Sequence, residues 1–194
     1  MKFHESLRII RDEHDALAAM LKSLHLLVRM GPGNDPARFF DTLRAMLYYI
    51  DQYPERLHHP KETGLLLPKV LARVPSVQAA VDRLDREHAK GEAAVRELQH
   101  LLLGWEFLGE SRRAEFVEAF DRYVVFYRDH MRLEESEILP AAEQHLSEEE
   151  WDDLDRAFAE NQDPLTGKHP APELYAALFK RIVDHAPEPI GLGV

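Results

Sequence analysis

The sequence predicts an all-α protein: an up-down-up-down four-helix bundle followed by a short helical C-terminal extension. Two observations lead to this prediction. Four long segments carry apolar residues in alternating steps of three and four, which is the period of an amphipathic helix, and short connections separate the segments. We expect the bundle to occupy residues 1–146 and the extension, packed on or beside it, to occupy residues 147–194.

The first helix is expected over residues 3–30, with an apolar stripe of Leu7, Ile10, Leu17, Leu21, Leu24 and Val28. His14 takes the step between Ile10 and Leu17, where a bundle helix normally has leucine. Its imidazole should therefore point into the core. A glycine-rich turn ends this helix, and Asp35-Pro36 then resembles an N-cap followed by proline at the first helical position.

The second helix should run from about Pro36 towards Val70, with an interruption in its middle. Pro54 and Pro60 each remove a main-chain hydrogen bond, and proline inside an ordinary helix costs ~3 kcal/mol or more. We therefore expect this helix to be kinked or broken. His58 lies in the interrupted stretch, six residues out of level with His14, or ~9 Å along a helix axis.

The third and fourth helices are expected over residues 77–107 and 112–145. His88 lies in the apolar seam of the third, and Gly91, one turn later, would leave space beside it. His88 and His130 lie at nearly equal distances along the chain from the turn that joins these two helices. Antiparallel packing should therefore bring the two histidines to a similar height.

The strongest functional pattern is a His-x-x-x-Glu motif that occurs twice. The pair His58 and Glu62 recurs 72 residues later as His130 and Glu134. Positions i and i+4 share one face of a helix, so each pair points an imidazole and a carboxylate in the same direction. The candidate metal ligands are His14, His58, Glu62, His88, His130 and Glu134, with His59 as a seventh.

Surface ion pairing is the competing explanation, because a single His-x-x-x-Glu on a helix is usually a solvent-exposed pair. Two pairs in register, each preceded by a histidine in place of a core residue, instead favour one shared site. Buried glutamates are costly unless a cation lies between them. Imidazole suits iron, zinc, copper and nickel, whereas oxygen-only sites suit magnesium or calcium.

Residues next to the candidate ligands give weaker signals. His59 directly follows His58, so only a distorted helix would turn both rings inward. Tyr123 and Tyr127 are expected to pack in the core, with a role behind the ligands as the alternative. Three further residues, Glu13, Glu135 and Glu137, are expected in solvent, whereas Glu87 or Asp129 could orient a ligand histidine.

Composition excludes several classes of protein. The chain of 194 residues has no cysteine, which removes disulfides, thiolate catalysis and iron–sulfur clusters. Its net charge of −11 disfavours nucleic acid as a partner. No apolar run approaches the ~20 residues of a membrane span, and the N-terminus lacks the apolar core of a signal peptide. We therefore expect a cytoplasmic protein with no membrane or nucleic-acid partner.

At the histidine and glutamate motifs the chain resembles the hemerythrin-like family, also called the HHE cation-binding domain. The resemblance covers about residues 5–145. It implies a non-haem di-iron centre in which Glu62 and Glu134 bridge two iron ions, and zinc or manganese could replace the iron. It also implies terminal ligands, which would be His14, His58, His88 and His130, with His59 as the source of a fifth nitrogen.

Oxygen-carrying members of that family differ from this chain. They have a second histidine on the third helix and a His-x4-Asp motif on the fourth, whereas position 92 here is Glu and the fourth helix has Glu134. Simple oxygen transport is therefore disfavoured. We expect binding of a diatomic ligand (O2 or NO) or of peroxide in sensing, scavenging or stress response.

Two alternatives remain open at this point. One is enzymatic: a di-iron oxidase or peroxidase, or an iron-donating repair protein. The other is a metal-responsive interaction module whose contact surface is the C-terminal extension, and a homodimer would be consistent with that role.

Overall fold

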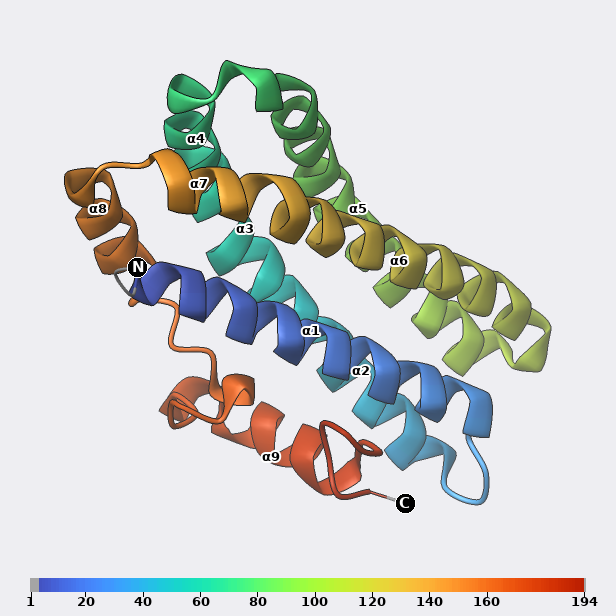
Figure 1. Cartoon of the computed structure of the whole chain (residues 1–194). Coiled ribbons are helices and arrows are strands. Elements are labelled where there is room, and N and C mark those ends of the chain that lie inside the picture. The colour runs from blue at the N-terminus through green and yellow to red at the C-terminus, as the bar shows by residue number, and fades with distance from the viewer. Residues whose placement is uncertain (1–3, 194) are drawn as a thin grey trace.

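The computed structural model describes residues 4–193, and every regular element within them is helical (Figure 1). The bundle is formed by α1 (Glu5–Met30), α2 (Pro36–Gln52), α3 (His59–Lys61), α4 (Leu67–Arg73), α5 (Gln78–Leu108), α6 (Arg113–Leu133) and α7 (Leu139–His145). The all-α bundle predicted from the sequence is confirmed. Position 3, where the first helix was expected to begin, lies outside the described residues.

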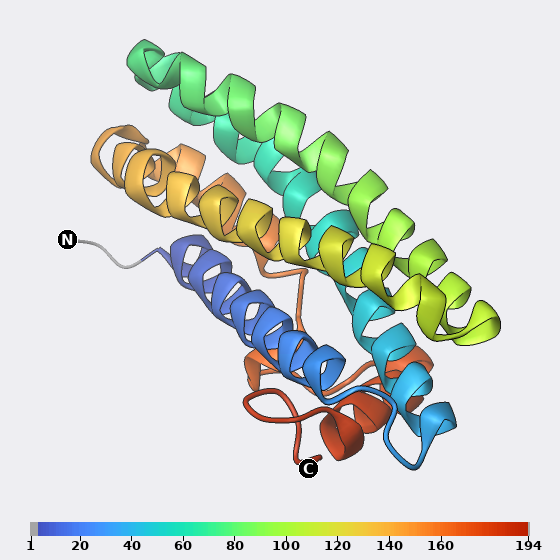
Figure 2. The ribbon, with the colours of Figure 1, turned by 90° about the vertical axis from the view of Figure 1, so that its right-hand side faces the viewer.

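Four long helical rods make up the bundle. α1 and α5 are single helices, whereas α2, α3 and α4 follow one another along the second rod and α6 and α7 along the fourth. Figure 2 shows these rods lying lengthwise beside one another. Asp35 caps α2 by accepting a hydrogen bond from the main-chain N–H of Arg38 at 3.1 Å, with Pro36 in the first turn.

The second and fourth rods contain π-helical turns, η1 (Pro54–His58), η2 (Glu62–Leu66) and η5 (Glu134–Ile138). In η1 the N–H of His58 reaches the carbonyl of Tyr53 at 3.2 Å, one residue further back than in an α-helix. The interruption predicted in the second helix is therefore a widening of the helix. Proline explains it, because a proline ring clashes with the carbonyl four residues earlier and provides no N–H.

Two apolar cores fill the bundle and a polar layer separates them. The large apolar core includes Leu17, Tyr53, Val95, Trp105, Phe116 and Tyr127. The small apolar core includes Ile10, Leu66, Leu84, Ile138, Trp151 and Phe158. Each rod therefore contributes side chains to the large core on one side of the polar layer and to the small core on the other side of that layer. Any polar side chain between the two cores is shielded from water on both sides.

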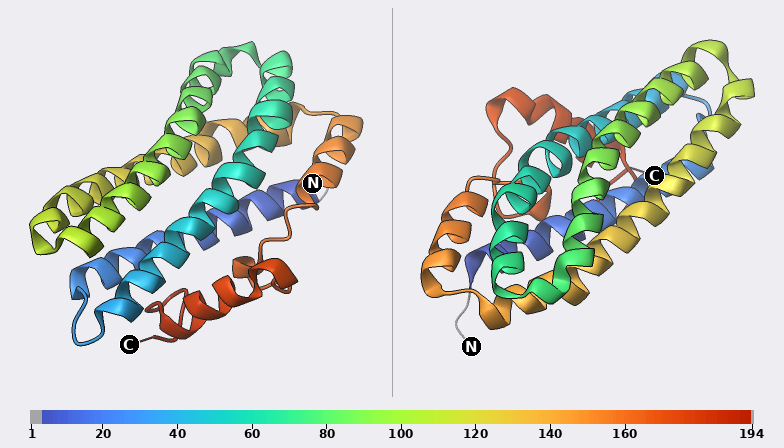
Figure 3. Two further views of the ribbon diagram at one scale, coloured as in Figure 1. Left: turned by 180° about the vertical axis from the view of Figure 1, so that it is seen from behind. Right: turned by 90° about the horizontal axis from the view of Figure 1, so that it is seen from above.

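The C-terminal residues pack against the bundle through α8 (Glu148–Phe158) and α9 (Ala176–His185). Figure 3 shows α8 near the beginning of α1 and α9 alongside α2. Asp155 of α8 accepts hydrogen bonds from the main-chain N–H and the hydroxyl of Ser6, at 2.8 and 2.5 Å. Phe179 of α9 packs edge-on against Tyr49 of α2, with the ring centres 6.0 Å apart.

Short 3-10 turns complete the described chain: η3 (Pro75–Val77), η4 (Glu110–Arg112), η6 (Pro164–Thr166) and η7 (Glu173–Tyr175). A capping box begins α8, since Ser147 and Glu150 exchange hydrogen bonds between side chain and main chain. None of the helices in residues 4–193 is long and apolar enough to cross a membrane. The division of the chain at residues 146 and 147 stays a prediction.

Candidate metal centre

The seven candidate ligands meet in the polar layer between the two apolar cores. All are buried, and each is 8% exposed or less: His14, His58, His59, Glu62, His88, His130 and Glu134. They come from all four rods, because α1 contributes one, the second rod three, α5 one and the fourth rod two. The six-residue difference in level between His14 and His58 does not separate them, since their ring centres lie 5.2 Å apart.

The side chains form two groups whose donor atoms lie within 4.8 Å of one another. The first cluster consists of His14, His58, Glu62 and Glu134, and the second cluster consists of His59, Glu62, His88 and His130. Glu62 belongs to both. The structure therefore brings together every ligand that the sequence suggested, including His59, whose ring is stacked on that of His88 at 4.4 Å.

The two glutamates each face both clusters. Glu62 places one oxygen 3.0 Å from Nε2 of His58 and the other 3.3 Å from Nε2 of His88. Glu134 places one oxygen 3.1 Å from Nε2 of His14 and the other 3.4 Å from Nε2 of His130. Two carboxylates that each divide their oxygens between two groups of imidazoles are arranged as bridges between two cation positions.

A metal pair fits these residues. Among the described residues, both oxygens of Glu62 and Glu134 and Nε2 of three histidines are buried without a hydrogen-bond partner. These atoms approach one another, but not with hydrogen-bond geometry. Donor atoms that each lie ~2.1 Å from a common ion are ~3.0–3.4 Å apart, close to the distances found here. Unpartnered buried polar atoms are costly, and bound cations would satisfy all of them together.

Electrostatics point in the same direction. Burial alone would lower the pKa of His58, but Glu62 and Glu13 outweigh it and hold that pKa well above its ordinary value. Burial alone would also lower the pKa of His88. The neighbouring carboxylates of Glu134 and Glu62 outweigh this effect and raise the pKa of His88 to about 9. Without a metal, imidazolium groups therefore neutralise the glutamates, and cations would bind in exchange for these protons.

Every candidate histidine also has its second ring nitrogen occupied, which fixes the orientation of the ring. The Nδ1 contacts are His14 with Glu135 at 2.8 Å, His58 with Glu13 at 2.7 Å, His59 with Glu55 at 3.1 Å, His88 with Thr63 at 2.7 Å and His130 with Glu87 at 3.1 Å. A carboxylate only accepts, so Nδ1 must donate to it in the four rings that face one, whereas the Thr63 hydroxyl beside His88 can donate or accept. In those four rings, the Nε2 lone pair is then available to a metal once any Nε2 proton is released.

These outer contacts correct part of the sequence interpretation. The expectation that Glu13 lies in solvent is wrong, because Glu13 is buried and accepts from His58. Glu135 is exposed as expected, but its carboxylate also contacts the candidate ligand His14. Glu87 orients His130 as suggested, whereas Asp129 is exposed. The sequence reasoning missed Glu55 and Thr63. The i, i+4 spacing of Glu55 and His59 was the available signal for the first.

Behind His59, two tyrosines support the carboxylate of Glu55. The hydroxyls of Tyr127 and Tyr123 both donate to Glu55, the latter at 3.3 Å. Burial raises the pKa of Glu55 to about 7, although the two tyrosine hydrogen bonds oppose this rise. The space beside Gly91 is filled by this group, because a Cβ at position 91 would meet the Tyr127 hydroxyl and the Glu55 oxygens.

A small cavity borders both clusters. Its lining includes His58, His59, Tyr53, Met131 and Asp163. The volume open to the centre of a water-sized molecule is about 10 Å³, roughly the room that one water needs. A ligand that enters without moving the side chains is therefore limited to a few atoms.

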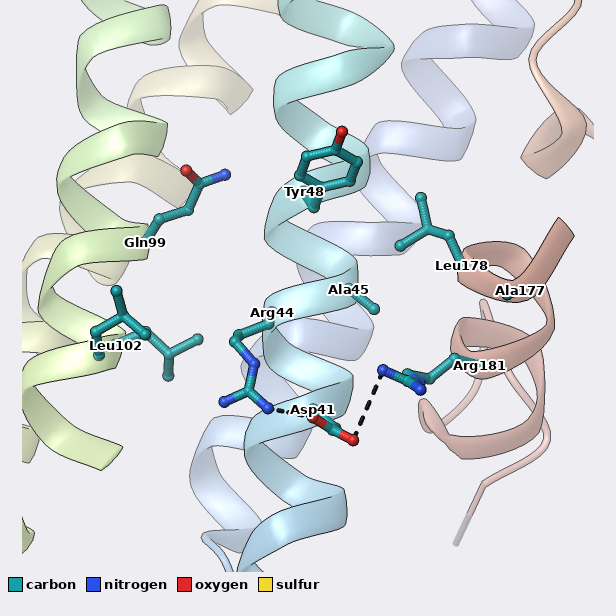
Figure 4. Close-up of a pocket in the computed structure, with 10 residues that line it drawn as sticks. Asp41, Arg44, Ala45, Tyr48, Gln99, Leu102, Ala177, Leu178 and Arg181 are labelled. Atoms are coloured by element: carbon teal, nitrogen blue, oxygen red, sulfur yellow. Dashed lines mark hydrogen bonds and ion pairs between the residues drawn. The ribbon is translucent and has the colours of Figure 1, made fainter. Parts of the chain in front are cut away.

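A roomier pocket of about 450 Å³ lies elsewhere, on the surface between α2, α5 and α9. Figure 4 shows its charged side chains paired with one another, since Asp41 contacts both Arg44 and Arg181. Ion pairs and exposed apolar residues line this pocket, and it is separate from the histidine clusters.

Fold and site together define a helical bundle with a buried histidine–glutamate centre suited to a pair of cations. The family model of the hemerythrin HHE cation binding domain matches residues 5–142, and the chain belongs to this family. The matched region contains all seven candidate ligands and ends before α8. Among curated proteins and among solved structures, none matched this chain.

Proposed function

We propose that the chain holds two iron ions between the four rods and binds a small diatomic ligand or peroxide beside them. The observation that carries the proposal is the set of buried, unpartnered oxygen and nitrogen atoms around Glu62 and Glu134. In this proposal the two glutamates bridge the ions, His14 and His58 complete one coordination group, and the histidines of the second cluster complete the other.

Bound iron would supply the redox chemistry and a coordination position for the ligand. The chain itself limits what reaches that position. The neighbouring cavity admits only a few atoms, which favours O2, NO or peroxide over organic substrates. The buried Tyr53 and Met131 keep bulk water away from the histidine side of this cavity. We propose a sensing, scavenging or stress-response role for a centre with such selective access.

Metal analysis of the full-length protein, purified without added metal, tests the proposal. We expect close to two iron ions per chain, and His58→Ala or Glu134→Ala should reduce this content severalfold because each removes a donor atom. His25→Ala is the matched control, because His25 lies on α1 beside Asp121 and outside both clusters. Unchanged iron content in both site variants would refute the assignment.

Ligand binding is tested separately with the iron-loaded protein. Adding NO to the reduced protein should change its visible absorption, and removal of NO should restore the original spectrum. Sustained consumption of peroxide and an added reductant would instead support the enzymatic alternative. A cytoplasmic location and a homodimer stay predictions.

A further inference from the structure

We propose that the segment following α8, which lies outside the family match, is part of the metal centre, and that Asn161 is a positioning residue for the first cluster. This inference rests on the proposed metal-binding function. The side chain of Asn161 is 4% exposed and its amide donates to Oε2 of Glu13 at 2.9 Å. The same oxygen of Glu13 accepts from Nδ1 of His58 at 2.7 Å.

The contacts form one continuous line from the extension to a candidate ligand. Lys61, which precedes Glu62, donates to the side-chain oxygen of Asn161 and to the carbonyl of Ala157 at 2.6 Å. The amide of Asn161 is therefore held at its oxygen end by Lys61 and presents its nitrogen to Glu13. Because only the NH2 end can donate, this orientation is fixed by the two partners.

The backbone around Asn161 is shaped to direct side chains inward. Gln162 has φ of 45°, a conformation that costs free energy for a residue other than glycine. On either side of it, Asn161 and Asp163 are both buried, 4% exposed each. Asp163 accepts from the hydroxyl of Tyr49 at 2.5 Å and lines the cavity beside the histidines. The strained residue thus allows the residues before and after it both to make inward contacts from one loop.

The consequence for metal binding is asymmetric. Without the amide of Asn161, the carboxylate of Glu13 loses one of the two donors that hold its Oε2, so the ring of His58 is oriented by a less firmly held partner. Only the first cluster contains His58. The rings of the second cluster are oriented by Glu55, Thr63 and Glu87, none of which forms a hydrogen bond or ion pair with the extension in the described residues.

The test is metal release from the full-length protein, loaded with ferrous iron without oxygen and mixed with excess chelator. We expect Asn161→Ala to accelerate release of one of the two ions by about tenfold, the lower end of the range for outer-sphere partners, and to leave the other unchanged. Asn161→Asp, which has the same size and still accepts from Lys61, should accelerate the same phase. It tests the contact without creating a cavity.

Two further variants separate positioning from general loosening of the loop. Tyr49→Phe removes the hydrogen bond to Asp163 but leaves Asn161 and Glu13 intact, so both release phases should stay as in the wild type. Thr63→Val removes the partner of His88 and should accelerate the other phase.

The outcomes are distinct. Release unchanged in both Asn161 variants would overturn the inference while leaving the proposed function standing. Equal acceleration of both phases would overturn it as well, because it would show a general loosening. A wild-type chain that binds no metal would overturn the proposed function and this inference together.

Discussion

Asp163 carries a buried carboxylate that the fold does not fully compensate. Burial raises its pKa from 3.8 to about 6, although the hydrogen bonds from Tyr49 and from the N–H of Leu165 oppose this rise. The folded protein thus binds this proton more readily than the unfolded chain does. Its contribution to stability is fully present below about pH 4 and is lost as the pH rises towards 6.

Replacement of this group should therefore change the pH dependence of folding. Asp163→Asn does not titrate, so its free energy of unfolding relative to the wild type should increase by about 1 kcal/mol between pH 5 and pH 7.5. Urea denaturation of both proteins at the two pH values measures the difference. Asp85→Asn, at an exposed position on α5, is the control and should show no such change. A constant difference for Asp163→Asn would contradict the prediction.

At the scale of one helix, α5 offers two glycines in opposite environments. At Gly91 a Cβ would lie 3.0 and 3.1 Å from the oxygens of Glu55, besides the hydroxyl of Tyr127. At Gly104, nothing lies within 4 Å of such an atom. The first glycine is required by packing, whereas the second only weakens the helix.

Alanine at the two positions should have opposite effects. Gly91→Ala should lower the free energy of unfolding by about 1–3 kcal/mol, because it overpacks the site behind His59. Gly104→Ala should raise it by about 0.5–1 kcal/mol, because alanine favours the helix. Chemical denaturation of the two variants measures both changes, and a stabilised Gly91→Ala would show that the Tyr127 and Glu55 side chains move aside without cost.

How far the sequence predicts these elements depends on the kind of signal. Helical periodicity and the repeated motif predict the rods and six of the seven candidate ligands, because both depend on spacing along one helix, whereas His59 depended on a distortion of the helix. The π-helical turns of the second rod were predicted only as an interruption, and η5 in the fourth rod, which was expected to be one continuous helix, was not predicted. Pro54 and Pro60 show where hydrogen bonds are lost, but not how the chain re-forms them. The widened η1 is what allows His58 and His59 both to face the centre.

Contacts between rods were the least predictable part of the site. Glu13 and Glu135 lie next to candidate ligands in the sequence, which suggests a neighbouring, solvent-facing direction. Each reaches a histidine on another rod, His58 and His14 respectively, and Glu13 is buried there whereas Glu135 stays exposed. The contribution of Asn161 could not be predicted either, because it depends on how the loop after α8 folds back over α1 and α3.

At the scale of the whole molecule, the candidate metal centre lies between the two apolar cores and joins them. All four rods contribute donor atoms to one polar layer, so bound cations would link every rod at the same level. Without them, Glu62 and Glu134 remain buried at 0% and 1% exposure and depend on protonated histidines for neutralisation. Burial opposes their ionisation, yet the neighbouring histidines hold the pKa of Glu62 well below its ordinary value.

Removal of metal should therefore lower the stability of the whole bundle. A ligand present at 100 times its dissociation constant stabilises the folded state by about 2.7 kcal/mol. For a chain of this size, that corresponds to a fall in Tm of roughly 5–10 °C when the metal is removed. Thermal unfolding of the metal-loaded and chelator-treated protein measures this difference. In Glu134→Ala, removal of metal should change the Tm little or not at all, because one of the two proposed bridging carboxylates is absent. Equal Tm values for the metal-loaded and metal-free wild type would contradict the proposed link between the rods.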